Sequence, residues 1–213
     1  MEIEKRVLYL RVSQIKSLDD ILTSSDKIIE YINQDQSAAV VFSLTEEPQS
    51  DEATREMFAH FVLGLPAVTA AVSHDFSGFS LEFLTLFDKL ISEQECLINN
   101  LPVSNSYGTD FMKRYRIVAG RKSAYDLKKY LSGNCRQSIR LPNVTIPDYE
   151  GSLQEKTDMY INDLFKDKTD FEVNSIAACF VKARRGGKAA FNEESIRFYA
   201  LIKRKSEEYA GGK

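Results

Sequence analysis

Hydrophobic residues in the first half of the chain follow two different spacings. Short, mainly apolar runs at residues 7–12, 38–42 and 67–72 predict three strands, the last two of them buried. Between these runs, apolar residues recur at helical spacing after Ser17 and again before Gly64. This β-α-β-α-β order with short connections favours a parallel sheet that is covered by helices.

The two helices of this half can be predicted in more detail. Ser17 is a typical N-cap residue, and Asp19 and Asp20 follow it in the first turn, where carboxylates face the positive end of the helix dipole. The apolar stripe of this helix continues to Ile32. The second helix is expected to turn one side toward the sheet, made of Met57, Phe58, Phe61, Val62 and Leu65.

The second half of the chain is predicted to be mainly helical. Short strand-like pieces at 89–91 and 96–98 come first, and a loop with one short strand is expected within 138–151. Helical spacing is found around Tyr107, Phe111 and Tyr115, around Ala124, Leu127 and Leu131, and over 153–165, 171–185 and 192–209. We therefore expect an α/β core over residues 1–145 and a helical C-terminal region over residues 146–213.

Composition narrows the class of protein. With 43% hydrophobic and 28% charged residues in 213, the chain resembles a soluble globular protein, and its net charge of −3 argues against a nucleic-acid partner. No apolar run approaches the roughly 20 residues of a membrane-spanning helix, and the charged N-terminus is unlike a signal peptide. The three cysteines lack the spacing of a metal site, so we expect reduced thiols, a cytoplasmic protein and no bound metal.

Candidate chemistry is concentrated where the third apolar run gives way to a helix. This turn contains a single glycine, Gly78, and the helix is expected to begin near Phe79. A turn that leads into a helix leaves backbone N–H groups unpaired, so it can bind an anion or stabilise a developing oxygen charge. Turns of this kind are also common in α/β proteins that have no site there, and this alternative stays open.

The residues around this turn resemble those of the enoyl-CoA hydratase/isomerase (crotonase) superfamily. Residues 65–72 are similar to the family strand Leu-Pro-x-Pro-x-Ile-Ala-Ala-Val, and Gly78 falls on the first glycine of the family's glycine triplet. Glu82 and Asp88 fall on the family's glutamate and aspartate. The resemblance covers roughly residues 5–135. It implies an α/β fold of the ClpP/crotonase type, a repeated ββα spiral core, whose helical C-terminal region builds a homotrimer or hexamer.

The resemblance also implies a chemistry. Family members bind an acyl thioester of coenzyme A or of an acyl-carrier protein, and this thioester carries the substrate in place of a separate cofactor. Phe79, through its backbone N–H, and Gly78 then lie at the oxyanion hole that polarises the thioester carbonyl. Glu82 is the expected acid or base. The implied reaction is isomerisation, hydration or dehydration through an enolate, in a biosynthetic setting such as secondary metabolism.

Several departures from the family pattern favour an alternative. Phe79 and Ser80 replace two glycines of the triplet, and residues 99–104 offer no carboxylate for the second catalytic glutamate. The loop expected to supply the first oxyanion donor, residues 45–51, contains Pro48, which has no N–H. The alternative is a catalytically inactive homologue that serves as an accessory or structural subunit.

Other residues near the turn complete the candidate site. His74 can act as a base near neutral pH or bond its own loop, and Asp75 follows it. Ser77 resembles the serine of Clp proteases, but no histidine follows His74, which argues against a hydrolase. Basic residues within 182–205 can contact phosphates of coenzyme A or an acidic carrier protein, although such runs are more often solvated helix faces. A more distant alternative is an unrelated α/β domain whose Gly78 turn binds phosphate.

Overall fold

The structure is a computed structural model that describes residues 1–6, 9–35, 37–97, 107, 111–132, 141 and 144–185. Its centre is a six-stranded sheet in which the strands follow one another in chain order. The strands are β1 (Glu2–Lys5), β2 (Tyr9–Ser13), β3 (Ala39–Ser43), β4 (Val68–Val72), β5 (Lys89–Ile91) and β6 (Val144–Thr145). β1 is antiparallel to β2, whereas every other neighbouring pair is parallel. The parallel sheet predicted from the first half of the chain is therefore confirmed.

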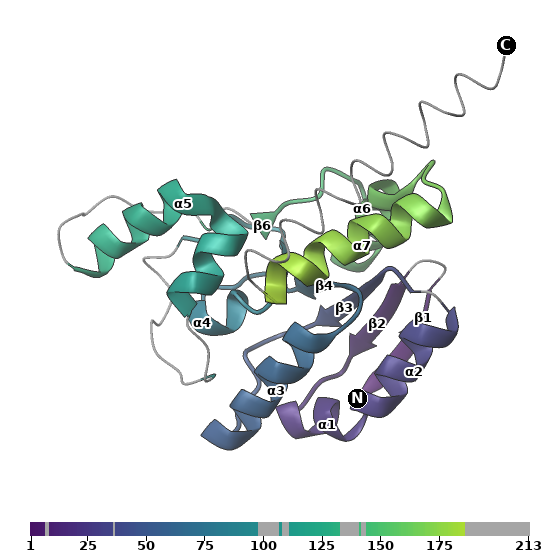
Figure 1. Cartoon of the computed structure of the whole chain (residues 1–213), viewed down its shortest axis with the longest axis horizontal. Helices are drawn as coiled ribbons and strands as arrows, with labels where there is room; N and C mark the ends of the chain where they lie inside the picture. Colours follow the sequence, from purple (N-terminus) through teal and green to yellow (C-terminus); the bar gives the residue numbers. More distant parts are fainter. Residues whose placement is uncertain are drawn as a thin grey trace, which may run out of the picture.

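Helices cover both faces of this sheet. One face packs against helices that precede β6, and the other packs against α6 and α7 (Figure 1). Neighbouring residues of one strand belong to different faces: Val40 faces the first core and Val41 the second. The helices are α1 (Leu18–Thr23), α2 (Ser25–Asp35), α3 (Glu52–Gly64), α4 (Leu81–Leu84), α5 (Phe111–Leu131), α6 (Leu153–Phe165) and α7 (Asp170–Arg185).

Local sequence signals locate several helix ends correctly. Ser17 caps α1 by accepting from the backbone N–H of Asp20, and the Asp20 carboxylate accepts from the Ser17 N–H in return. The predicted helix over 153–165 coincides with α6, and α7 begins one residue before the predicted start. The predicted helix over 192–209 lies outside the described residues, and so does residue 98 of the predicted strand piece 96–98.

Other details differ from the expectations. Strand β1 was not expected, because a single edge strand of four residues has no periodicity of its own. The apolar stripe after Ser17 runs through two helices, since the chain turns at Ser24 between α1 and α2. Met57 was expected in the core but its side chain is 60% exposed, because the buried side of α3 is narrower than its apolar residues suggest.

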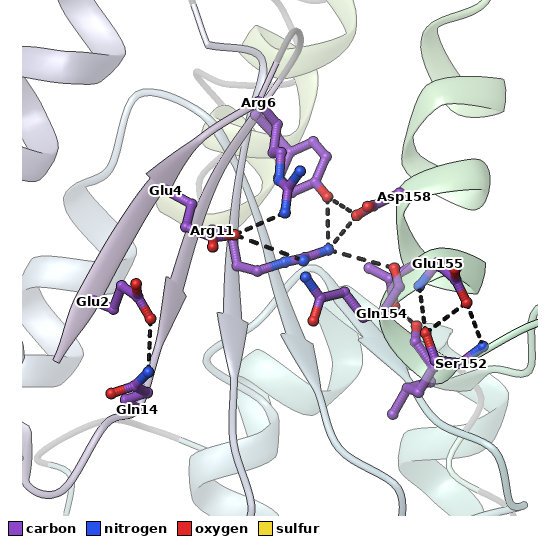
Figure 2. A network of polar contacts seen from close by, with 12 residues as sticks. Glu2, Glu4, Arg6, Arg11, Gln14, Ser152, Gln154, Glu155 and Asp158 are labelled. Carbon is purple, nitrogen blue, oxygen red and sulfur yellow. Dashed lines mark hydrogen bonds and ion pairs between the residues drawn. The ribbon is translucent and has the colours of Figure 1, made fainter.

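Polar contacts hold α6 on the sheet. Arg11 in β2 is almost completely buried, and its guanidinium donates to the carboxylate of Asp158 in α6 (Figure 2). The Tyr9 hydroxyl donates to the same carboxylate oxygen. Burial and this contact with Asp158 raise the pKa of Tyr9. The described part of the C-terminal region is thus packed on the core of its own chain.

A second buried network holds α7. Arg184 donates to the carbonyl oxygens of residues 62, 65 and 67 at distances of 3.0, 2.8 and 2.6 Å. Its Nε lies 3.4 Å from a carboxylate oxygen of Asp88, which also accepts from the N–H and hydroxyl of Thr69. Asp88, the residue aligned with the family's aspartate, therefore links β4 to α7.

Candidate functional site

The turn between β4 and α4 is closed by its own hydrogen bonds. The Ser73 hydroxyl donates to the backbone oxygen of Asp75 at 2.8 Å, and the Asp75 carboxylate accepts from the N–H and the hydroxyl of Ser77. Gly78 is exposed, has no positive φ, and a Cβ added there would meet nothing within 4 Å. The backbone at this point therefore does not require glycine.

Phe79 is fixed at both its backbone and its side chain. Its N–H, the expected oxyanion donor, donates to the carbonyl oxygen of Phe76 at 3.0 Å. Its ring is 1% exposed and lies between the rings of Phe76 and Phe83, with centroid distances of 5.3 and 5.9 Å. The residue that replaces a family glycine is part of the aromatic core.

A carboxylate from a distant loop lies at the start of α4. Ser80 caps this helix by accepting from the Phe83 N–H at 3.2 Å. Glu47, in the loop after β3, accepts from both the backbone N–H and the hydroxyl of Ser80. The hydroxyl of Tyr107 donates to the same carboxylate at 2.7 Å. Two successive amides, those of Phe79 and Ser80, are thus both bonded to acceptors within the chain.

Sequence reasoning missed Glu47 and the role of Tyr107. The loop 45–51 was identified as the source of the first oxyanion donor, but only for its backbone and for Pro48. The acidic pair Glu46-Glu47 in that loop was the available signal, because a carboxylate facing a helix start is a favourable partner for it. Nothing in the sequence indicates that Tyr107, 60 residues away, completes the site.

Glu82 lies in α4 and is buried beside Tyr107, which also contacts Glu47. Its side chain is 9% exposed, and its carboxylate accepts from the backbone N–H of Tyr107 at 3.1 Å. Tyr107 therefore contacts two carboxylates, Glu82 through its N–H and Glu47 through its hydroxyl. Burial and the negative charges of Glu47 and Glu82 raise the pKa of Tyr107 well above its usual value, so its hydroxyl stays protonated as a donor.

The remaining predicted residues make contacts of their own. His74 is 76% exposed, and its Nδ1 lies 2.6 Å from a carboxylate oxygen of Glu93, which also pairs with Lys156. The contacts with His74 and Lys156 lower the pKa of Glu93. The structure brings Asp75 and Ser77 together and places His74 with Glu93, while Glu82 bonds Tyr107.

The described residues include neither a metal-binding cluster nor a membrane-spanning helix. Among them, no group of three or more His, Cys, Asp and Glu side chains is arranged to hold a metal ion. In the same part of the chain, no helix has the length and apolar character needed to cross a membrane.

Solved structures that resemble this chain share its fold. No protein-family model and no curated protein matches the sequence. Among solved structures, Pseudomonas aeruginosa AtuE is 13% identical, with 95% of this chain and 91% of that chain covered and a TM-score of 0.59. A probable enoyl-CoA hydratase/isomerase from Mycobacterium abscessus is 11% identical, with 97% and 95% covered and a TM-score of 0.55.

A third similar structure is the enoyl-CoA hydratase from Bacillus halodurans. It is 13% identical, with 93% of this chain and 90% of that chain covered and a TM-score of 0.51. Because identities this low carry information on architecture only, the likeness does not extend to the chemistry of the site. The expected fold class is confirmed: this chain is an α/β protein with the crotonase fold, and it resembles enoyl-CoA hydratase/isomerase structures at low sequence identity.

Proposed function

We propose that this chain is a catalytically inactive crotonase-fold protein that serves as an accessory or structural subunit. The observation that carries the proposal is the Glu47 carboxylate bonded to the N–H and hydroxyl of Ser80. In the family that the sequence resembles, backbone donors at this turn receive the thioester oxygen. Here the chain supplies its own negatively charged acceptor beside those donors.

The sign of the electrostatic effect supports this proposal. A single oxyanion-hole donor contributes about 3–4 kcal/mol to stabilising a negatively charged oxygen. A carboxylate about 4 Å from that oxygen repels it by about 4 kcal/mol at an effective dielectric constant of about 20. Glu47 in its observed place therefore cancels the contribution of a donor. The Phe79 N–H, already bonded to Phe76, adds no compensating donor.

Turnover assays test the proposal. The purified chain is incubated with short- and medium-chain enoyl and 3-hydroxyacyl thioesters, each on coenzyme A and on an acyl-carrier protein. We expect the wild type and Glu82→Gln to give the same rate as buffer. A rate well above buffer that disappears in Glu82→Gln contradicts the proposal.

A second candidate function is enolate chemistry on an acyl thioester, with Glu82 as the acid or base and the N–H of Phe79, beside Gly78, in the oxyanion hole. It is favoured by the placement of the Glu82 carboxylate close to the turn, where both Glu82 and Glu47 contact Tyr107. This function requires Glu47 to leave Ser80 and the Phe79 N–H to exchange its partner. Thermal-shift measurements with thioesters separate the two functions, since an enzyme is stabilised by its ligand.

Assembly and location form part of the proposal. We infer a homotrimer or hexamer, because the fold is shared with the crotonase family and the sequence resemblance implies this assembly. We infer a cytoplasmic location because the three separated cysteines are typical of reduced thiols. Light scattering coupled to size-exclusion chromatography gives the mass directly. A mass equal to one chain of 24.2 kDa contradicts the oligomer.

A further inference from the structure

Helix α5 concentrates positive charge on a chain that is acidic as a whole. Residues 111–132 contain seven Lys and Arg residues and one acidic residue, Asp126, which gives this segment a net charge of +6. The whole chain carries −3, so the other residues together carry −9. The cations of α5 therefore form a local site of attraction for anions, in addition to the basic run within 182–205.

Part of this charge surrounds a hollow. A cavity of about 590 Å³ on α5 is lined by four cationic side chains and an exposed aromatic ring, namely Lys113, Arg116, Arg121, Lys128 and Tyr125. The tyrosine is 59% exposed, and the Lys129 ammonium lies over one face of its ring, 4.6 Å from the centroid, so the other face is the one offered to a ligand. In the described part of the chain, no ion pair involves Arg116, Arg121 or Lys128. Their charges are available to a ligand.

A bend in α5 makes the hollow concave. Gly120 has φ 83° and ψ 169°, a conformation that interrupts the helix and that side chains with a Cβ rarely adopt. Lys113 and Arg116 come from the segment before the bend, whereas Arg121 and Tyr125 come from the segment after it. Figure 1 shows the two segments of α5 meeting at an angle. The bend therefore lets two helical segments line one cavity.

The inner side of α5 is fixed independently of the hollow. Arg114 is buried and donates to the backbone oxygens of Thr85 and Arg184, at 3.2 and 2.6 Å. Tyr115 is also completely buried in the core. Because these contacts anchor the first segment of the helix, the basic side chains on its outer side are not needed to hold it in place.

We propose that this hollow binds a nucleoside diphosphate or a close relative, through its phosphate groups and its base. Guanidinium groups such as those of Arg116 and Arg121 bind phosphate oxygens in pairs, and lysines add point charges. A cavity of about 590 Å³ lies within the range of small-molecule sites and exceeds the space of a phosphate group alone. The exposed ring of Tyr125 supplies a surface on which a base stacks.

The shape of the site favours a small ligand over a macromolecule. A nucleic acid needs a positively charged track along its backbone, whereas the cations that line this cavity gather around one place on α5. The proposal is independent of the inactivity argued above, because the hollow is lined by α5 alone and contains neither Glu47 nor Glu82.

Calorimetric titration of the full chain with ADP and with inorganic pyrophosphate tests the assignment. We expect ADP to bind more tightly than pyrophosphate, and both affinities to fall as ionic strength rises. The double variant Arg116→Gln/Arg121→Gln should weaken both ligands by about tenfold or more, since two charged hydrogen-bond donors are lost. Tyr125→Ala should weaken ADP and leave pyrophosphate unchanged.

A matched control removes the same charge elsewhere. Lys122 is exposed on α5 but does not line the hollow, and Lys166 is exposed at the end of α6. The double variant Lys122→Gln/Lys166→Gln should bind ADP as the wild type does, with an unchanged Tm in both double variants showing that they fold. Equal weakening by the control overturns the site, as does the absence of ADP binding at millimolar concentration. Tight binding of single-stranded oligonucleotides without binding of ADP also overturns it.

Discussion

Replacement of Glu47 by alanine tests the central contact of the candidate site. The substitution removes the acceptor of three hydrogen bonds, donated by the Ser80 N–H, the Ser80 hydroxyl and the Tyr107 hydroxyl. Ser80 and Tyr107 are almost completely buried, so these donors lose a protein partner in a place with little access to water. The Ser80 hydroxyl loses its acceptor but still accepts from the Phe83 N–H, so it keeps one of its two hydrogen bonds, and the loss falls mainly on the other two donors.

The expected magnitude follows from those two donors. An unsatisfied buried donor costs about 1–3 kcal/mol, and the half-buried position of Glu47 lets water restore part of the loss. We therefore expect Glu47→Ala to lower the free energy of unfolding by about 2–3 kcal/mol. For a domain of this size, this corresponds to a decrease in Tm of about 5–10 °C. Glu47→Gln keeps one acceptor oxygen and should lose about half as much.

Denaturant unfolding followed by circular dichroism measures the change, and differential scanning fluorimetry gives Tm. The matched control is Glu46→Ala, which removes a neighbouring carboxylate that is exposed to solvent. Surface substitutions of this kind change stability by about 0.5 kcal/mol or less. If Glu47→Ala is no less stable than Glu46→Ala, the carboxylate does not hold the start of α4 and the reasoning fails.

Three further predictions concern other parts of the molecule. Gly78→Ala should change the free energy of unfolding by about 0.5 kcal/mol or less, because no positive φ and no neighbouring atom opposes a Cβ; a loss above about 2 kcal/mol in denaturant unfolding would show that the turn requires glycine. Asp158→Ala should lower that free energy by about 3 kcal/mol, since it leaves the buried Arg11 with only the more distant carboxylate of Glu4, at 3.9 Å; an unchanged Tm would contradict the role of this pair. Burial raises the pKa of Cys96 to about 11, so mass-spectrometric mapping of alkylation near pH 8 should show Cys179, which is exposed, labelled well before Cys96; equal labelling rates would contradict the buried placement.

The buried arginine of α7 shows how distant parts of the chain depend on one another. Arg184 bonds three backbone oxygens between the last turn of α3 and the start of β4, and it lies beside Asp88. Arg114 in turn bonds the backbone oxygen of Arg184. Burial lowers the pKa of Arg114 to about 10, opposed by the charge of Asp88. Helices α5 and α7 are thus fixed against the sheet by polar contacts as well as by apolar packing.

The order of strands and helices was predictable from the sequence because it rests on local patterns. A continuous apolar run marks a strand covered on both faces, and Ser17 and Gly64 mark helix ends through their own chemistry. The resemblance around Gly78 led from this order to the crotonase fold, and similar solved structures confirm that fold. The sequence did not predict β1, because a strand of four residues is too short to show an alternation of apolar and polar residues.

The environment of the site was decided by the tertiary structure alone. Glu47 is 33 residues from Ser80 and 60 from Tyr107, and no spacing rule connects residues across such separations. Whether an amide is free depends on which acceptor the packing brings to it, and the amides of Phe79 and Ser80 both find one inside the chain. The sequence by itself thus determined the elements and the likeness to a fold. The tertiary structure determined that the residues of the predicted site are bonded to one another, because those bonds join segments far apart in the chain.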